Sequence, residues 1–177
     1  MCGIYGIINS DNIKNNLKQI KTLFNKENKR GPDNTDIDIY NELNVILGFH
    51  RLSINGLDMG SNQPITVNNK ILICNGEIYN YKQFYSDYNI TPKTHSDCEA
   101  IIYMYEIFGI DGALKYIDGV FSFILIDYSK MDAMKMFVAR DPFGVRPMFM
   151  FNLSSSDLNH FFKSPLRFIT SDFKKVL

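Results

Sequence analysis

The sequence has no surplus of charge of either sign, no long apolar run and little cysteine. Lysine plus arginine and aspartate plus glutamate each number 19, which gives a formal net charge of +0. A balanced charge without a long basic run disfavours binding to nucleic acids or to anionic membranes. No stretch approaches ~18 consecutive apolar residues, and the N-terminus lacks the pattern of a secretory signal. We therefore expect a cytoplasmic protein with no membrane or nucleic-acid partner.

Cysteine and histidine are scarce and irregularly spaced. The cysteines are Cys2, Cys74 and Cys98, too few and too unevenly placed for a disulfide framework or a zinc ribbon. A reducing compartment fits this usage. None of the three histidines stands at a metal-ligand spacing from another. We expect no metal site.

The length and composition fit one domain with a sizeable core. The chain has 177 residues, of which 45% are hydrophobic, and we expect a single domain spanning residues 1–177. Apolar runs predict strands at residues 2–8, 43–49, 64–67, 70–75, 121–127, 135–140, 147–151, 161–163 and 168–170. Helical spacing predicts helices at residues 12–27, 80–88, 96–108 and 110–117, and a further helix start at 171–175.

Local signals predict turns and a helix cap. Asn68 and Asn69 are residues that tolerate a hairpin turn, and residues 141–144 have the composition of another. Ser96, followed three residues later by Glu99, is typical of a capping box at a helix start.

The order of these elements predicts an α+β fold. There are two strand-rich blocks and two helical blocks, and the apolar runs are too continuous for a sheet with one wet face. We expect two stacked, mainly antiparallel sheets covered by helices.

The strongest functional signal is the position of Cys2, directly after the initiator methionine. Since a cysteine side chain is small, removal of Met1 is expected to leave a thiol and a free α-amine on one residue. Unperturbed thiols and α-amines have pKa values within about one unit of each other, so the amine can take up the thiol proton directly or through one water. This is N-terminal nucleophile chemistry. The plain alternative is a chance cysteine on a buried first strand.

Three further segments contain residues suited to amide chemistry. Asn75 and Gly76 end a predicted strand in a turn and offer a carboxamide and a backbone N–H as two oxyanion donors. Arg51 suits bidentate contact with a carboxylate, and Asp97 lies in a first helical turn. Singly, each has a plain explanation: a hairpin turn, a solvated charge and a carboxylate favoured by the helix dipole. Together, the cation and the anion match the α-carboxylate and α-ammonium of a free amino acid.

The chain resembles the class II glutamine amidotransferases in several motifs that follow one another in the family's order. They are MCGIYGI, RGPD, HRLSI, QPI, NGEIYNY, SDCEAI, DGVFSF and ARDPFGVRP. NGEIYN and ARDPFGVRP look most like the glutaminase domain of asparagine synthetases. The resemblance runs from Cys2 to about Leu177. It implies the four-layer αββα sandwich of the N-terminal nucleophile hydrolases, and hydrolysis of L-glutamine to L-glutamate and ammonia through a Cys2 thioester.

The resemblance implies catalytic roles for three residues. Cys2 would be the nucleophile, with its own α-amine as proton shuttle, and Asn75 and Gly76 would form the oxyanion hole. Asn80 would steady the loop or the amide. Arg30 of RGPD is expected to be a structural ion-pair partner, since arginine is seldom an acid or a base.

The resemblance also implies which residues bind the ends of glutamine. Arg51 would hold the α-carboxylate, and Asp97 with groups around Glu77 would hold the α-ammonium. Neighbouring groups of the HRLSI segment complete the substrate site: Leu52, Ser53 and Ile54.

The sequence departs from the family in two ways. Lys29 stands where many relatives have histidine before RGPD, outside the proposed chemistry. Asparagine synthetases continue into an ATP-using synthetase domain, which we expect to be absent from these residues. The glutaminase step is therefore expected to need no cofactor, and ATP and Mg would belong to that absent domain.

Use of the ammonia for asparagine synthesis from aspartate would need a synthetase subunit or domain in trans. We expect an exposed apolar patch for this partner, with candidates Phe143, Val145, Phe149 and Phe151.

Two other functions stay open. The first is a non-catalytic module that senses glutamine or binds a synthetase. The second is a related hydrolase that acts on another amide. The intact set of catalytic residues favours an enzyme over the first alternative. The pair of Arg51 and Asp97 argues against the second.

Overall fold

The computed structural model describes residues 2–8, 13–151 and 167–169. They form two compact units, one made of the chain up to Leu52 and from Pro147 onward, the other of Ser53–Arg146. Within the described ranges, no helix is long and apolar enough to cross a membrane. The strand predicted at 161–163 and the helix start at 171–175 lie outside the described residues. The single domain expected from the length stays a prediction.

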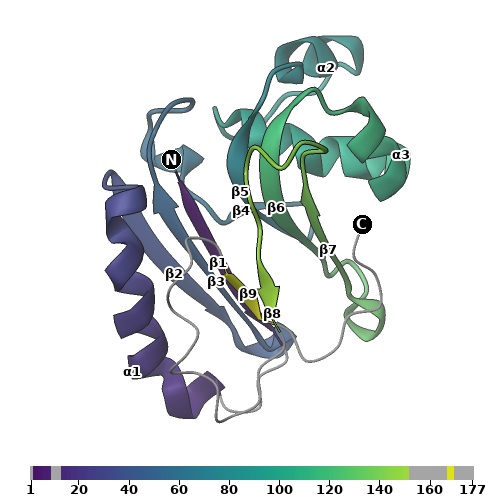
Figure 1. The fold of residues 1–177 in the computed structure, drawn as a ribbon. Coiled ribbons are helices and arrows are strands. Elements are labelled where there is room, and N and C mark those ends of the chain that lie inside the picture. The colour runs from purple at the N-terminus through teal and green to yellow at the C-terminus, as the bar shows by residue number, and fades with distance from the viewer. Residues whose placement is uncertain (1, 9–12, 152–166, 170–177) are drawn as a thin grey trace. The chain divides into compact units, whose positions relative to one another are not determined.

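The first unit is built on a five-stranded sheet with a helix along one face (Figure 1). Its elements are β1 (Gly3–Ile8), α1 (Ile13–Phe24), η1 (Asn25–Arg30), β2 (Asn34–Tyr40), η2 (Asn41–Leu43), β3 (Val45–Arg51), β8 (Met150–Phe151) and β9 (Arg167–Ile169). The strand order is β2-β3-β1-β9-β8. β3 is antiparallel to β1 and β2, whereas β9 is parallel to β1 and β8.

Helix α1 packs on this sheet through the apolar face that its sequence predicts. Ile20 and Phe24 join Tyr5, Ile7 and Ile46 in one buried cluster. The helix expected over residues 12–27 ends at Phe24 as an α-helix and continues as the 3-10 helix η1. Helix α1 thereby packs against the face of the sheet that carries Tyr5 and Ile7 of β1.

Strand β2 was not predicted, although its sequence carries a strand signal. Ile37 and Ile39 alternate with Asp36 and Asp38, a period of two typical of a strand with one solvated face. The strand is an edge of the sheet and pairs along its whole length with β3. Its alternating acidic residues suit an edge, where charge discourages pairing with another chain.

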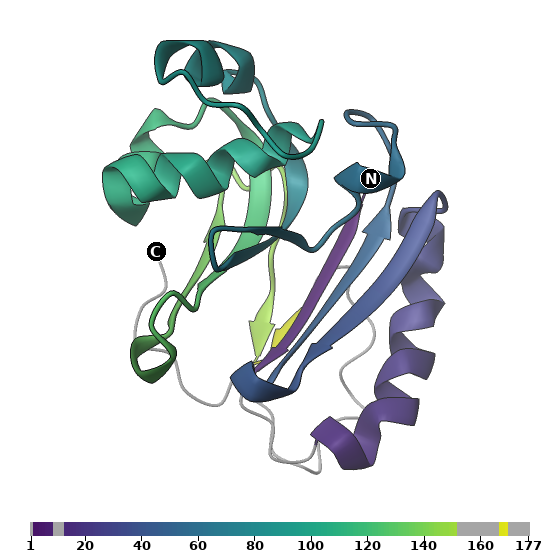
Figure 2. The same cartoon turned by 180° about the vertical axis from the view of Figure 1, so that it is seen from behind.

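The second unit is built on a four-stranded antiparallel sheet with two helices against one face (Figures 1 and 2). Its elements are η3 (Met59–Ser61), β4 (Ile65–Val67), β5 (Lys70–Ile78), α2 (Tyr81–Asp87), η4 (Asp97–Glu99), α3 (Ala100–Tyr116), β6 (Gly119–Asp127), η5 (Met131–Ala133) and β7 (Lys135–Arg140). The strand order is β4-β5-β6-β7. With two mainly antiparallel sheets and their helices, the predicted α+β class is confirmed; the stacking of the sheets stays a prediction.

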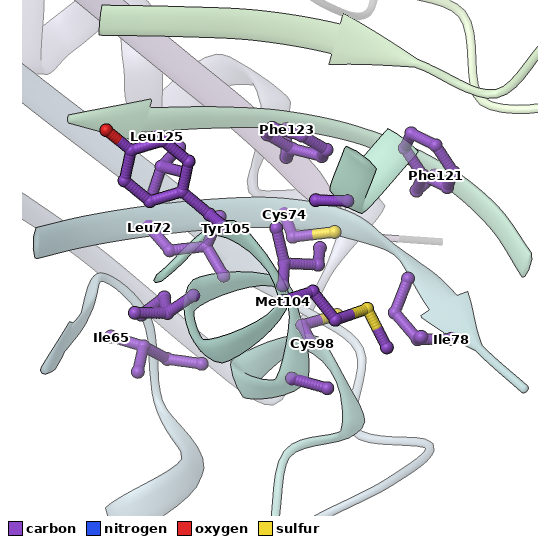
Figure 3. Close-up of a cluster of buried hydrophobic side chains, with 14 of the residues drawn as sticks. Ile65, Leu72, Cys74, Ile78, Cys98, Met104, Tyr105, Phe121, Phe123 and Leu125 are labelled. Atoms are coloured by element: carbon purple, nitrogen blue, oxygen red, sulfur yellow. The ribbon is translucent and has the colours of Figure 1, made fainter. Parts of the chain in front are cut away.

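The core of the second unit lies between its sheet and its helices (Figure 3). Alternate residues of β5 and β6 point toward Met104 and Tyr105 of α3. They are Leu72, Cys74, Ile78, Phe121, Phe123 and Leu125. Because successive strand residues face opposite sides of a sheet, the residues between them lie on the other face.

The predicted turn between β4 and β5 and the predicted boundary between two helices are confirmed. Asn68 and Asn69 have φ of 48° and 58°, as a tight turn between β4 and β5 requires. Gly109 has φ 68° and ψ 177° inside α3. A left-handed φ suits glycine, and the break divides the segment into the two helices that the sequence predicts.

The turn at residues 141–144 is confirmed, but the hairpin predicted there is wrong. Gly144 N donates to Asp141 O at 3.0 Å, which closes the turn. However, β7 pairs with β6 and β8 pairs with β9, so the turn leads from one sheet to the other. Of the strand predicted at 147–151, only Met150–Phe151 is a strand.

The helix start at residues 96–99 is confirmed, but the capping box is wrong. In the part of the chain that the structure describes, Ser96 makes no side-chain cap hydrogen bond. The buried Glu99 carboxylate instead accepts from Lys93 N at 2.7 Å, Thr94 N at 2.6 Å and Tyr103 OH at 3.1 Å. Glu99 therefore fixes the segment before the helix that carries Asp97.

Candidate active site

Cys2 lies immediately before β1 and contacts the residue that follows β3. Its Sγ is 3.3 Å from both the backbone O and the backbone N of Leu52. The thiol can donate to this carbonyl, and the N–H can donate to the sulfur. An N–H aimed at sulfur also favours a thiolate. The backbone of Leu52 thus contacts the half-buried thiol on both its donor and its acceptor side.

Arg30 lies next to the nucleophile, where its role differs from the expected ion pair. Its Nη2 donates to the backbone O of Cys2 at 3.4 Å. Its Nε is buried and has no hydrogen-bond partner within the described ranges. The RGPD segment is in turn tied to the end of β3, because Asp33 N donates to Arg51 O at 3.0 Å and Pro32 bridges to the same residue.

Arg51 is the last residue of β3 and is buried, with 5% of its surface exposed. This excludes the plain explanation of a solvated surface charge. A buried guanidinium needs charged or strongly polar partners. The burial agrees with a role in binding a carboxylate, which stays a prediction.

Asn75 and Gly76 lie inside β5, and not in the turn that the Asn-Gly pair predicts. They are paired with Ser122 and Phe121 of β6, and the strand continues to Ile78. The turn prediction is wrong because a second strand, β6, pairs along the whole segment. A Cβ at Gly76 would overlap the backbone O of Val120, so this close approach requires glycine.

The carboxamide of Asn75 is buried and oriented by strand pairing. Only 2% of the residue is exposed, and Nδ2 has no hydrogen-bond partner in the described part of the chain. Most buried amide donors are paired. An unpaired one is therefore available to a ligand, as the oxyanion role requires.

The position of Asn75 is reinforced by Gln63, whose contribution the sequence did not reveal. Gln63 Nε2 donates to Cys74 O at 3.1 Å, and Gln63 Oε1 accepts from Cys74 N at 2.5 Å. The side chain thus continues the contacts of the β4 edge with β5 from Leu72, the partner of Ile65, to Cys74. The QPI motif was the available signal, and it now has a structural explanation.

Asp97 is buried beside the end of β5. Its Oδ2 accepts from Ile78 N at 2.7 Å, and its side chain hydrogen-bonds Asn55. Burial raises the pKa of Asp97 above its usual value, and the charge of Glu77 adds to this, whereas the hydrogen bonds oppose it. A bound ammonium group would favour the carboxylate form.

Glu77 follows Asn75 and Gly76 in β5 and is joined to the segment after β7. Arg146 Nη2 lies 3.5 Å from Glu77 Oε1. The ARDPFGVRP motif therefore contacts the NGEIYN motif through this pair. Asn80 is also placed: it donates to Tyr116 O at 2.9 Å and accepts from Asp118 N at 3.1 Å, so it steadies the loop.

The segment after Arg51 is less enclosed than the strands. Ser53 is half-buried, whereas 55% of Ile54 is exposed. Further along, Asp58 Oδ2 lies 2.8 Å from His95 Nδ1, and Ser61 Oγ accepts from His95 N at 3.1 Å. These contacts fasten the loop to the segment that carries Asp97.

The structure brings the predicted residues together in two sets. Cys2, Arg51 and Leu52 belong to the first unit, and the other predicted residues belong to the second. The latter are Ser53, Ile54, Asn75, Gly76, Glu77 and Asp97. Among the described residues, no group of three or more His, Cys, Asp and Glu side chains is arranged to hold a metal ion.

Comparison with known proteins identifies the family. The family model of the glutamine amidotransferase domain matches residues 1–174. A probable glutamine-hydrolysing asparagine synthetase of Acanthamoeba polyphaga mimivirus is 35% identical over 84% of this chain and 27% of its own length. The asparagine synthetase of Gallus gallus is 37% identical over 84% of this chain and 26% of its own. For asparagine synthetase 1 of Saccharomyces cerevisiae the values are 37%, 97% and 29%.

The chain thus spans less than a third of the length of these relatives. The match nevertheless covers five of the predicted site residues: Cys2, Arg51, Asn75, Gly76 and Asp97. The chain belongs to the glutamine amidotransferase domain family.

Proposed function

We propose that this chain hydrolyses L-glutamine to L-glutamate and ammonia through a thioester on Cys2. The observation that carries the proposal is the buried, unpaired Nδ2 of Asn75, in a strand beside a glycine that close packing requires. Such a donor has a fixed direction before substrate arrives. Preorganised donors of this kind stabilise a developing oxyanion more than a ground-state carbonyl.

The proposed reaction begins with proton transfer from the Cys2 thiol to its α-amine. The sulfur then attacks the side-chain amide carbon of glutamine, and the carbonyl oxygen becomes an oxyanion that accepts hydrogen bonds from Asn75 Nδ2 and Gly76 N. The α-amine returns the proton to the amide nitrogen, the C–N bond breaks, and ammonia leaves. Water then attacks the thioester, releasing glutamate and restoring the thiol.

Substrate recognition is proposed to use the two buried charges. Arg51 binds the α-carboxylate, with support from Leu52, Ser53 and Ile54. Asp97 and Glu77 bind the α-ammonium. Two opposite charges select a free amino acid, because a peptide-bonded glutamine lacks both groups.

The ammonia is proposed to serve asparagine synthesis from aspartate in a synthetase domain or subunit, where ATP and Mg would be used. The names of the relatives and their greater length support this partner. The turn after β7 offers a surface for it, since Phe143 is 92% and Val145 51% exposed. Phe149 is 39% exposed, and the side chain of Phe151 lies outside what the structure describes.

This turn is well organised for docking. The buried Asp141 carboxylate accepts from Val145 N at 2.9 Å and Arg146 N at 3.0 Å. Burial opposes ionisation of Asp141, but the backbone hydrogen bonds outweigh it and hold the pKa of Asp141 below its usual value. Phe143 is therefore displayed on a rigid turn, which lowers the entropy cost of binding.

The test is intact-mass measurement with an electrophilic glutamine analogue, together with glutamate release from glutamine. We expect a protein without Met1, one adduct on the wild type and none on Cys2→Ala. Glutamine binding without glutamate release would instead support a sensing or synthetase-binding module. Glutamate release measured with and without a matching synthetase polypeptide tests the partner.

A further inference from the structure

Ser122 is a buried polar residue that none of the preceding roles explains. It lies in β6 directly opposite Asn75 in β5 and has 0% of its surface exposed. Its Oγ has no hydrogen-bond partner among the residues that the structure describes. Asn75 Nδ2 is also buried and has no hydrogen-bond partner among the described residues. Two unpaired buried polar groups thus occupy one cross-strand pair.

The surroundings of this pair make the hydroxyl costly. Residues of the Figure 3 core alternate with Asn75 and Ser122 along their strands, so the pair lies on the opposite face of the sheet. Along the two strands, its neighbours on that face are the buried pair Ile73 and Ile124 on one side and the pair Glu77 and Val120 on the other. Ser122 is also paired with Arg140 of β7. A buried hydroxyl without a hydrogen-bond partner is unfavourable. An alanine would fit the same place without that cost.

We propose that Ser122 is a positioning residue of the oxyanion hole, whose hydroxyl hydrogen-bonds the Asn75 carboxamide when substrate is bound. The proposal rests on the proposed glutaminase function. Directly paired residues on antiparallel strands have Cβ atoms about 4.5–5.5 Å apart, within reach of a hydroxyl-to-amide hydrogen bond after a side-chain rotation. Of the two residues paired with Ser122, Arg140 is exposed, whereas Asn75 is buried and its Nδ2 lacks a partner among the described residues. Asn75 is therefore the group on which Ser122 acts.

The hydroxyl decides which end of the carboxamide faces the reacting carbonyl. An asparagine can present either Nδ2, which donates, or Oδ1, which would repel an oxyanion. Ser122 Oγ–H donates to Oδ1 and so directs Nδ2 toward the substrate. No covalent step involves Ser122, which acts only through Asn75.

The test is a double-mutant cycle of Ser122→Ala with Asn75→Ala, read as kcat and KM for glutamine and as Tm. We expect Ser122→Ala alone to lower kcat about three- to tenfold, with KM within about twofold. We expect its Tm to equal or exceed that of the wild type, because the unpaired hydroxyl is gone. If Ser122 had only a structural role, a loss of kcat would be accompanied by a lower Tm.

The double mutant and two control variants test whether Ser122 acts on kcat through Asn75. In the Asn75→Ala background, Ser122→Ala should leave kcat unchanged, because the group that it positions is absent. Ile124→Val, a packing change on the same strand and face, should lower Tm and leave kcat unchanged. Ser122→Thr, which retains the hydroxyl, should keep more of the wild-type kcat than Ser122→Ala.

Three results overturn the proposal. One is a wild-type kcat in Ser122→Ala, and another is an equal loss of kcat in both backgrounds. Either would leave the glutaminase function standing if Asn75→Ala and Cys2→Ala remain impaired. The third is a wild type without glutaminase activity, which would remove the proposed function as well.

Discussion

The two units hold their parts of the site in different ways. In the first unit, Cys2 is half-buried just before a strand, and its sulfur contacts the backbone N and O of Leu52. In the second unit, Asn75 is fully enclosed in the interior of a strand, and Asp97 is buried at a helix start. A nucleophile must be approached by its substrate, whereas oxyanion donors act through a fixed direction. The partial exposure of Cys2 and the burial of Asn75 agree with the two roles proposed for them.

The largest effect should come from substitutions of the half-buried Cys2. Cys2→Ala and Cys2→Ser should both lose glutaminase activity, because alanine has no nucleophile and a hydroxyl is far weaker than a thiol. Their Tm should remain close to that of the wild type, since the lost side chain is small and half-buried. Steady-state glutamate release and calorimetry check both parts. Turnover at the wild-type level by Cys2→Ala would remove the mechanism.

Removal of the buried donor should be the next largest effect. Asn75→Ala should lower kcat by about 10²–10³, the range for one oxyanion donor, with little change in KM. Asn80→Ala is a control from the same segment: it is the same substitution, but it removes two structural hydrogen bonds. It should lower stability by about 1–3 kcal/mol and leave kcat near the wild-type value. Equal kcat losses in the two variants would contradict the oxyanion assignment.

The third prediction concerns the buried cation of the first unit. Arg51→Ala should raise KM for glutamine about 30-fold or more, the cost of truncating a buried charged contact, and change kcat less. Arg140→Ala, which removes an exposed arginine of β7, is the control and should leave KM unchanged. An unaltered KM in Arg51→Ala would show that the α-carboxylate binds elsewhere.

A smaller, pH-dependent effect is expected from Asp97. Burial raises its pKa, so the carboxylate that binds the ammonium is lost at a higher pH than for an ordinary aspartate. KM for glutamine should therefore rise as pH falls through the raised pKa. In the free protein the sign for stability is opposite: the favourable contribution is complete below the unfolded pKa and is lost as pH rises through the folded one.

Asp97→Asn separates these two consequences. It should flatten the acid side of the KM profile, raise KM at neutral pH, and raise Tm there more than at acid pH. Kinetics and calorimetry at several pH values measure this. A variant that keeps the wild-type pH profile would exclude Asp97 as the group responsible.

The sequence predicted features that depend on neighbouring residues and missed those that depend on distant pairing. The Asn68–Asn69 turn and the break at Gly109 are local preferences, and both are confirmed. Asn75 and Gly76 have the same local preference for a turn, but pairing with β6 keeps them in a strand. Propensity is a weak prior that tertiary contacts override.

The candidate site was predicted by residue identity, and its supporting contacts were not. Motif order led to Cys2, Arg51 and Asp97, but nothing local indicated that Gln63 brackets Cys74. The Ser96 and Glu99 pattern was read as a cap, whereas Glu99 binds the chain before it. Long-range hydrogen bonds of this kind leave no periodic signal in a sequence.

The contact between Cys2 and Leu52 has a mechanical consequence. The N–H that lies against the sulfur belongs to the peptide group that joins Arg51 to Leu52. A peptide group is planar and rigid, so any rotation that accompanies a movement of Arg51 also turns this N–H relative to the sulfur. A movement of the Arg51 backbone is therefore linked to the electrostatic environment of the thiol through a single rigid plate of six atoms.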